Sequence, residues 1–475
     1  MQTNLYIDGN WVPSQSAQRF DVMNPATEDV IASVASADIF DADLALNAAS
    51  IAMQEWAARS PRDRSEVLRK AWELMTARLP EFARLITLEN GKANADAMGE
   101  ANYAAEFFRW FAEEAVRVDG LISHAPASGA RIIVQHKPAG IAVLVTPWNY
   151  PAAMGTRKIA PALAAGCAVI IKPASETPLT MLALMPLLEE AGVPKGVVNV
   201  LPSRNTGVLV DHMLHDPRVR VVSFTGSTEV GRKLLHSAAD QILKPAMELG
   251  GNAPAIVFED ANLDVAVEGV ILAKMRNLGE ACTAANRIYV HSSIAPAFTE
   301  KFTSAMAELK IGNGLEAGID VGPLVNSDTR NKVDAFVQDA VAKGAKVELG
   351  GVLPTGKGFF YPPTVLSGVP ETADCVGDEI FGPVAALQVF NDQEDVIRRA
   401  NDTEYGLVAY VFSEDMKRAL QVCERLDYGM VGLNRGLVSD PAAPFGGTKQ
   451  SGLGREGGHE GMHEFMETQY ISASW

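Results

Sequence analysis

Short apolar runs alternate with helical segments through the middle of the chain. The runs are typical of buried strands and cover Ile141–Val145, Cys167–Ile171, Val197–Leu201 and Val219–Phe224. The segments between them show helical spacing and cover residues 180–191, 206–214 and 229–239. Apolar strands separated by helices predict a parallel sheet that is covered on both faces. Such a doubly wound sheet binds its ligands at the carboxyl ends of its strands.

Helices are predicted before this region, and a second α/β set is predicted after it. Between residues 41 and 117, apolar side chains recur every three or four positions, as at Leu68, Trp72 and Met75, which indicates amphipathic helices. Further strands are expected at Ala255–Val257, Arg287–Val290 and Leu407–Phe412. Because binding sites favour the junction between two such sets, we expect the site where the first set gives way to the second.

Composition excludes several classes of function. The chain has 475 residues, of which 47% are hydrophobic, enough for a large core. Its formal net charge of −17 would be repelled by a phosphate backbone, so nucleic-acid binding is not expected. The four cysteines form no CxxC pair, which favours a reducing compartment. Since neither a signal peptide nor an apolar run of about 20 residues is evident, we expect a cytoplasmic protein without membrane contact.

One thiol and one carboxylate lie among small residues near the predicted junction. Cys282 ends the run Gly-Glu-Ala-Cys, and Glu248 lies in the run Met-Glu-Leu-Gly-Gly. Small neighbours leave room for a substrate around the sulfur, so the two side chains predict covalent catalysis on a carbonyl group. The alternative for Cys282 is an inert thiol in the core.

Five further candidates lie at the ends of predicted strands or the starts of helices. The amide of Asn149 either stabilises an oxyanion or occupies a turn between prolines. Gly226 and Ser227 join a strand to a helix, an arrangement that binds phosphate or only caps the helix. Lys172 follows a strand and either binds a ribose or phosphate group or is solvated. Glu379 precedes an apolar strand and either binds a ribose or caps a turn.

A zinc-protease pattern near the end of the chain is interpreted as coincidental. The run from His459 to His463 matches HExxH, in which two histidines on one helix face bind zinc. The run directly follows two glycines and lies close to the C-terminus, and no third ligand stands out. We therefore predict no metal site and keep a zinc hydrolase only as an alternative.

Taken in order, these segments resemble the aldehyde dehydrogenase superfamily over nearly the whole chain, from Tyr6 to the C-terminal strand. The resemblance implies a doubly wound, Rossmann-like α/β cofactor domain, a second α/β catalytic domain and a small β oligomerisation element. The implied boundaries are 1–117 and 138–250 for the cofactor domain, 251–445 for the catalytic domain, and 118–137 and 446–475 for the oligomerisation element. The last element implies a homodimer or homotetramer.

The resemblance also implies roles in the oxidation of an aldehyde to an acid. Cys282 would attack the aldehyde, Asn149 and the Cys282 N–H would stabilise the oxyanion, and Glu248 would activate the water that hydrolyses the thioester. Lys172 would contact the adenosine ribose, Ser227 the pyrophosphate and Glu379 the nicotinamide ribose. The implied cofactor site comprises Thr146, Pro147, Trp148, Lys172, Ser175, Glu176, Gly226, Ser227, Leu249, Glu379 and Phe381.

Three residues point to an anionic substrate. Arg157, Arg276 and Ser439 match the positions that hold the substrate carboxylate in succinate semialdehyde dehydrogenases. Two guanidinium groups favour an acidic tail and disfavour a cationic substrate such as betaine aldehyde. We therefore expect succinate semialdehyde to be oxidised to succinate. An ion pair between domains is the alternative for either arginine.

Other activities stay open at this point. Glutarate semialdehyde and sulfolactaldehyde carry similar anionic tails. A general aliphatic aldehyde dehydrogenase would need no arginines to bind its substrate. A CoA-acylating enzyme is disfavoured because the base Glu248 is present. A non-catalytic protein on the same fold is disfavoured because both the nucleophile and the base are present.

The cofactor is expected to be NADP, with NAD tolerated. Many NAD-selective members of the superfamily place Glu at the position of Ser175, where it repels a 2′-phosphate. Serine removes this repulsion and can donate a hydrogen bond, and Lys172 adds positive charge. The neighbouring Glu176 opposes this preference if its side chain turns inward.

Overall fold

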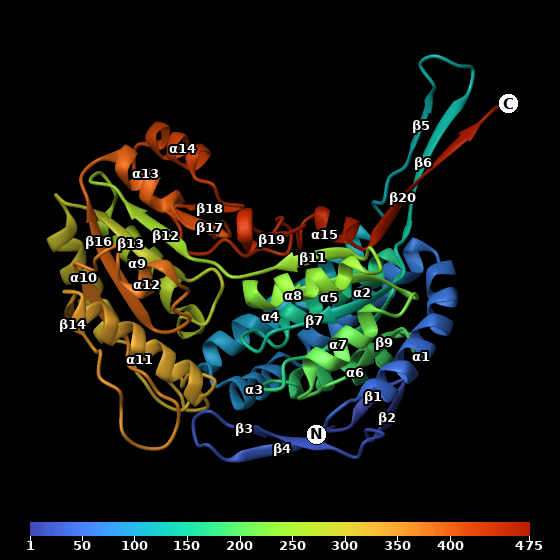
Figure 1. Ribbon diagram of the computed structural model, residues 1–475, viewed down its shortest axis with the longest axis horizontal. Coiled ribbons are helices and arrows are strands. Elements are labelled where there is room, and N and C mark those ends of the chain that lie inside the picture. Colours follow the sequence, from blue (N-terminus) through green and yellow to red (C-terminus); the bar gives the residue numbers. More distant parts are fainter.

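Two large sheets organise the protein, and the computed structural model describes residues 1–475 (Figure 1). The first sheet has eight strands in the order β19 (Gly452–Leu453), β11 (Lys244–Glu248), β10 (Val219–Thr225), β7 (Ile141–Val145), β8 (Ala168–Lys172), β9 (Val198–Val200), β1 (Leu5–Ile7) and β2 (Asn10–Val12). The five central strands are parallel. From β7 the sheet grows through β8 and β9 on one side and through β10 and β11 on the other, so β7 and β10 form a topological switch point.

Helices cover both faces of this sheet because its central strands are apolar on both sides. Ala142 and Leu144 of β7 pack into one core cluster, and Ile141 and Val143 pack into another. The first cluster is covered by α2 (Pro61–Thr76), α3 (Leu79–Asn90), α4 (Asn94–Glu114), α5 (Ala153–Ala165) and α6 (Leu179–Ala191). The second is covered by α1 (Ile39–Ala58), α7 (Thr206–Leu214) and α8 (Thr228–Ala239).

Local sequence signals place the ends of these helices. The Ser60 hydroxyl accepts a hydrogen bond from the Asp63 N–H at 3.1 Å, and Pro61 occupies the first turn of α2. Gly166 ends α5 in the left-handed region with φ 98°, which glycine adopts at little cost. The chain therefore turns directly from α5 into β8.

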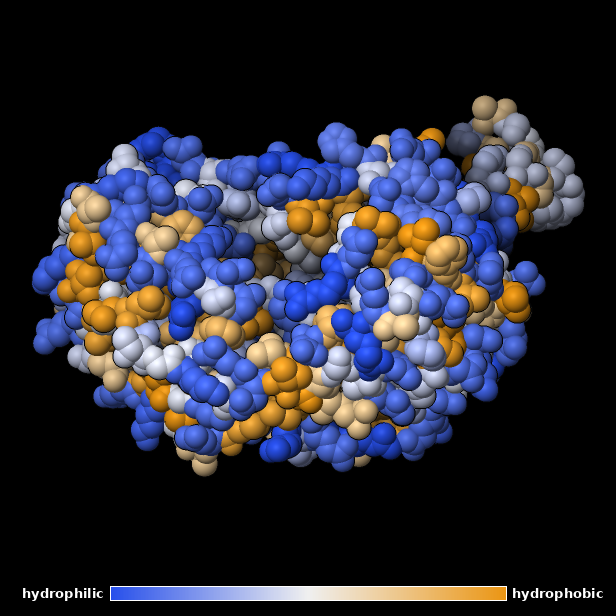
Figure 2. All heavy atoms as spheres, turned by 60° about the horizontal axis from the view of Figure 1, so that its bottom comes forward, coloured by the Kyte–Doolittle hydropathy of each residue, from blue (hydrophilic) through white to orange (hydrophobic).

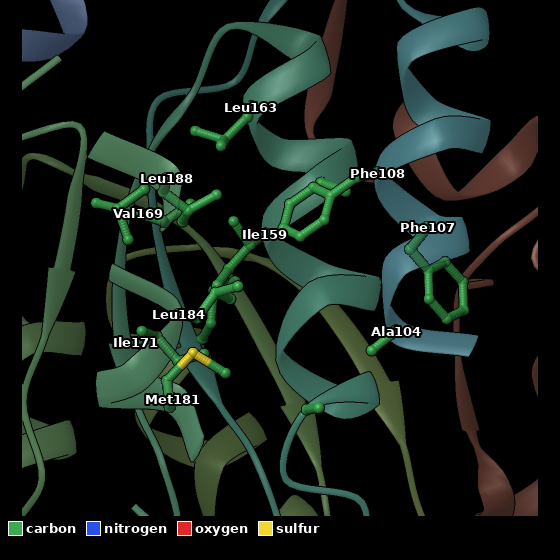
Figure 3. Packing of buried hydrophobic residues seen from close by; sticks show 14 of the residues in the cluster. Ala104, Phe107, Phe108, Ile159, Leu163, Val169, Ile171, Met181, Leu184 and Leu188 are labelled. Carbon is green, nitrogen blue, oxygen red and sulfur yellow. The ribbon is translucent and has the colours of Figure 1, made fainter. Parts of the chain in front are cut away.

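The largest core cluster lies between α4, α5, α6 and β8 (Figure 3). Phe108 of α4 points toward Ile159 of α5, and α6 contributes Met181 and Leu188 on the side of the sheet. All of these side chains are buried, so α5 is enclosed between another helix layer and the sheet.

The second sheet has seven strands and lies beyond β11 along the chain. Its order is β14 (Lys346–Leu349), β15 (Thr364–Ser367), β16 (Val384–Phe390), β13 (Ala285–His291), β12 (Ala253–Val257), β17 (Val408–Phe412) and β18 (Met430–Leu433). Its helices are α9 (Leu263–Met275), α10 (Ala295–Ala307), α11 (Ser327–Ala342), α12 (Asp374–Gly377), α13 (Gln393–Asn401) and α14 (Met416–Arg425). Figure 2 shows the surface hollowed between the parts built on the two sheets.

A small three-stranded sheet projects from the body (Figure 1). It consists of the hairpin β5 (Leu121–His124) and β6 (Arg131–Pro138) and the C-terminal strand β20 (Met466–Ala473). A separate hairpin is formed by β3 (Arg19–Met23) and β4 (Val30–Ala35). The predicted fold class, a doubly wound α/β sheet with a second α/β set and a small β element, is confirmed.

We expect Phe108→Ala to lower the free energy of unfolding by about 3–5 kcal/mol, because it removes a fully buried ring and leaves a cavity. The measurement is urea unfolding followed by circular dichroism. Phe40→Ala is the matched control: the Phe40 side chain is 63% exposed, so its loss should change the same quantity by less than about 0.5 kcal/mol. Equal effects of the two substitutions would contradict this view of the core.

Candidate active site

A cavity of about 240 Å³ lies at the switch point of the first sheet. The loop after β7 and the turn after β10 enter it from one side, and Cys282 and Glu379 enter it from the second sheet. The lining residues are Pro147, Trp148, Asn149, Met154, Thr225, Gly226, Ser227, Leu249, Gly250, Cys282, Thr329, Lys332, Glu379 and Phe381. The expectation of a site at the junction of the two α/β sets, beside the carboxyl ends of the first sheet's strands, therefore agrees with this geometry.

The segment that carries Cys282 is hydrogen-bonded directly to the loop after β7. The Asn149 side chain donates to the Glu280 carbonyl at 3.0 Å. The Asn277 side chain donates to the carbonyls of both Asn149 and Glu280, each at 2.9 Å. Asn277 and Leu278 adopt positive φ of 52° and 43°, a strained conformation that is retained beside the thiol. An amide has two N–H donors, so Asn149 keeps one for a bound oxyanion.

A buried ion pair fixes the backbone of Asn149 through a hydrogen bond to its carbonyl. The Lys92 ammonium lies 2.5 Å from the Glu100 carboxylate and donates to the Asn149 carbonyl at 2.7 Å. Glu100 also accepts a hydrogen bond from the Ala152 N–H at 2.8 Å. This pair was not predicted, because Lys92 in the connection between α3 and α4 and Glu100 within α4 have no periodic signature.

Burial raises the pKa values of the two reactive groups. It raises the pKa of the Cys282 thiol to about 12, with Glu379 and Glu248 contributing in the same direction and Arg157 and Arg276 opposing it. Burial, followed by the charge of Glu456, raises the pKa of Glu248 well above the ordinary carboxyl range. Glu248 ends β11, and one of its carboxyl oxygens has no hydrogen-bond partner. A buried carboxyl group with a free oxygen can exchange a proton with a water molecule.

Arg157 lies in a buried ion pair rather than alone beside the cavity. Its guanidinium is 1% exposed, pairs with the Glu456 carboxylate and lies 4.3 Å from the Phe445 ring. Lys158 pairs with the same carboxylate and donates to the Ser223 hydroxyl at 3.0 Å. The carboxylate of Glu456 is therefore an ion-pair partner of Arg157 within the protein. An ion pair was the alternative that the sequence left open for this arginine.

Arg276 and Ser439 are brought together. An Arg276 nitrogen lies 3.4 Å from the Ser439 hydroxyl and 3.4 Å from the Thr283 hydroxyl, next to Cys282 in the chain. The guanidinium also lies 5.5 Å from the centre of the Tyr150 ring. No carboxylate pairs with Arg276, so its charge is available to a ligand.

Most of the predicted cofactor residues lie along the carboxyl edge of the first sheet, and Glu379 and Phe381 face them from the second part of the chain. Seven of them line the cavity: Pro147, Trp148, Gly226, Ser227, Leu249, Glu379 and Phe381. The rings of Trp148 and Phe381 meet edge to face at 5.3 Å. Burial raises the pKa of Glu379 to about 7, and its carboxylate accepts a hydrogen bond from the Gly251 N–H at 3.4 Å.

The remaining predicted cofactor residues lie at or near the end of β8. The Thr146 N–H donates to the Lys172 carbonyl at 3.2 Å, which joins the two strand ends. The Lys172 ammonium is buried without a hydrogen bond or ion pair, and the Ser175 hydroxyl donates to Glu176 at 3.2 Å. Ser227 caps α8, whose N-terminus faces the cavity. A buried free cation and an open helix N-terminus fit a dinucleotide with its phosphates.

The histidines of the HExxH run lie away from this cavity. Only one helical turn, α15 (Glu460–His463), forms there. His459 lies 2.7 Å from the Glu114 carboxylate and 3.1 Å from His463. No three side chains of the metal-binding types are grouped so that they could hold an ion. No helix is both long and apolar enough to cross a lipid bilayer.

Comparison with known proteins gives similarity over the whole chain. The model of the aldehyde dehydrogenase family matches residues 11–471. A succinate-semialdehyde dehydrogenase of Paenarthrobacter nicotinovorans is 52% identical, over 93% of this chain and 98% of that protein. A glutarate-semialdehyde dehydrogenase of Pseudomonas putida is 48% identical, over 99% and 97%. The crystal structure of an NADP-dependent enzyme of Escherichia coli superposes with a TM-score of 0.98 at 44% identity, over 100% and 98%.

The raised pKa of Cys282 predicts how fast the thiol reacts in the protein without cofactor. Only the thiolate is alkylated, so its rate with iodoacetamide should rise about tenfold per pH unit from pH 7 to pH 9.5, without a plateau. The rate is measured by mass spectrometry of the Cys282 peptide in a Cys423→Ser background, because Cys423 is the other partly exposed thiol. Cys282→Ser supplies the blank. A plateau below pH 8 would show an activated thiolate and contradict the prediction.

Proposed function

The chain belongs to the aldehyde dehydrogenase family, whose members oxidise aldehydes, and from this premise we propose that its substrate is succinate semialdehyde and its cofactor NADP. The observation that carries the choice of substrate is the unpaired guanidinium of Arg276, which contacts the hydroxyls of Ser439 and of Thr283, the residue after Cys282. A carboxylate on the substrate tail would give that charge a partner. The relatives that act on succinate and glutarate semialdehydes support the same class of substrate.

We propose that the Cys282 thiol passes its proton through Glu248 to water and that the thiolate then forms the carbon–sulfur bond to the aldehyde carbon. The second N–H of Asn149 and the backbone N–H of Cys282 would donate to the oxygen as it becomes negative. Glu379 and Phe381 would hold the nicotinamide end of the cofactor, which when bound would supply the acceptor for the hydride and so allow a thioester to form on Cys282. Glu248 then takes a proton from water as the water attacks this thioester, and the acid is released. The raised pKa of Glu248 supports this role, because an ionised carboxylate with a raised pKa is a stronger base than an ordinary one.

NADP is proposed as the preferred cofactor, with NAD tolerated. Lys172 supports this because it is a buried cation without an anion of its own. Ser175 adds a hydroxyl next to it, and its present acceptor is Glu176. The similar Escherichia coli enzyme described as NADP-dependent supports the same choice. Glutarate semialdehyde and sulfolactaldehyde are the alternative substrates, since a guanidinium accepts a longer acid or a sulfonate equally well.

The chain is proposed to divide into a cofactor domain of residues 1–117 and 138–250, a catalytic domain of residues 251–445, and an oligomerisation element of residues 118–137 and 446–475. Separate core clusters in the two large parts support this division. Because β19 pairs with β11, only β20 of the final range joins the projecting sheet.

The four free cysteines support a reducing location such as the cytoplasm.

A homodimer or homotetramer is proposed from the projecting sheet. Its three strands have no core of their own, and Ile122 is 72% exposed, with Leu121 and Tyr470 also exposed. A small sheet of this kind is only marginally stable alone, so a second copy of the chain is proposed to bury its exposed apolar side chains.

Arg276→Ala tests the proposed substrate class. We expect kcat/KM for succinate semialdehyde to fall at least about 30-fold, because one anchor worth about 2 kcal/mol or more is removed from a desolvated carboxylate. Butanal, which has the same chain length and no charge, should lose little. Initial rates are measured with NADP and with NAD. Equal rates for the two aldehydes in the wild type, unchanged by the substitution, would show a general aldehyde dehydrogenase and a structural arginine.

The assembly is tested by placing charge on the projecting sheet. Combined Leu121→Glu and Ile122→Glu should reduce the mass measured by light scattering after size exclusion, because like charges would then meet at the interface. Val352→Glu is the control, since Val352 is 73% exposed but lies in a loop of the catalytic part. An unchanged mass for the hairpin variant would place the interface elsewhere.

A further inference from the structure

One loop at the carboxyl edge of the first sheet has no assigned role and carries an unpaired charge. Strands β8 and β9 are parallel neighbours, with Ile171 opposite Val200. Lys172 ends β8, and Arg204 lies four residues beyond the end of β9. Since parallel strands end at the same edge, the two cations belong to one side of the sheet.

The backbone of this loop is held firmly. The Pro202 carbonyl accepts a hydrogen bond from the Ala37 N–H at 2.8 Å, and the Ser203 hydroxyl donates to the Ala37 carbonyl at 2.8 Å. The Arg204 N–H donates to the Ser36 hydroxyl at 3.2 Å. Arg204 therefore starts from a fixed position, although its side chain is exposed.

The guanidinium of Arg204 has no anionic partner in the protein. It lies 5.5 Å from the centre of the Phe20 ring and forms no hydrogen bond or ion pair through its side chain. Its charge reaches the end of β8: the pKa of Lys172 is lowered to about 8 by burial, and Arg204 contributes to this lowering while Glu176 opposes it. Two cations that repel each other across an open edge are stabilised by an anion between them.

We propose that Arg204 is a cofactor-specificity residue that binds the 2′-phosphate of NADP together with Lys172. The inference rests on the proposed use of NADP and adds a residue to that subsite. Lys172 is 5% exposed, and its ammonium, which has no hydrogen bond or ion pair in the protein, can bind a phosphate oxygen. Arg204 closes the site from the loop, and a guanidinium matches a phosphate through two parallel hydrogen bonds. Ser175 would exchange its present acceptor, Glu176, for a phosphate oxygen.

Binding of two small nucleotides by isothermal titration calorimetry tests this proposal without turnover. Adenosine 2′,5′-bisphosphate carries the 2′-phosphate, and 5′-AMP lacks it. Arg204→Gln should weaken the bisphosphate about tenfold, the loss of one charge-assisted contact, and leave 5′-AMP unchanged. Arg204→Lys should keep most of the affinity because it keeps the charge. The bisphosphate should also bind with a smaller dependence on salt in Arg204→Gln than in the wild type.

Arg220→Gln is the matched control, because Arg220 is an exposed, unpaired arginine at the opposite end of β10. It should bind both nucleotides as the wild type does. An equal loss for both nucleotides in Arg204→Gln, or no loss, overturns the proposal. If the wild type itself binds the two nucleotides equally, the role of Arg204 fails together with NADP use. None of these results depends on the aldehyde, so the proposed substrate is judged separately by the Arg276→Ala rates.

Discussion

The hydrogen bond from Asn149 to the Glu280 carbonyl is the contact on which the whole site depends. It joins the loop after β7 in the first sheet to the segment before β13 in the second, so it fixes the thiol relative to the edge where a dinucleotide fits. The Asn277 side chain donates hydrogen bonds to the backbone carbonyls of Asn149 and Glu280. Lys92, which is paired with Glu100, also donates to the Asn149 carbonyl. Buried polar groups of this kind are costly when one member is lost, because the others are then left unpaired. The arrangement therefore works as a unit.

Low solvent exposure explains the electrostatics of the cavity. Burial is the first cause of the raised pKa at Cys282, Glu248 and Glu379, so three acids are all shifted toward their neutral forms. The sign is the same for each: protonation is favoured up to a higher pH than in water. A neutral thiol must then lose its proton before it attacks a carbonyl carbon. Glu248, with one free oxygen and a raised pKa, is suited to hold such a proton.

Much of the fold followed from periodicity, because buried parallel strands are apolar on both faces. The runs at 141–145 and 206–214 agree with β7 and α7 residue for residue. The short antiparallel strands β1, β2 and β19 were not predicted, since two or three residues carry too little pattern. An ion pair was an open alternative for Arg157, but its partner Glu456 was not predicted. It joins residues 299 positions apart, and periodicity contains no information about such distant partners.

This distant partner decides which arginine is free. Both Arg157 and Arg276 have the same charge and lie near Cys282, so sequence alone treats them as one clamp. Glu456 forms ion pairs with both Arg157 and Lys158, whereas Arg276 forms no ion pair: its guanidinium lies beside the Ser439 hydroxyl and the Tyr150 ring, and Asp96 acts on it only as a more distant charge. A substrate carboxylate near Arg157 would meet the charge of Glu456, while near Arg276 it would meet a charge without a counterion. The difference between the two arginines is therefore set by Glu456, which pairs with Arg157 and leaves Arg276 without an ion pair.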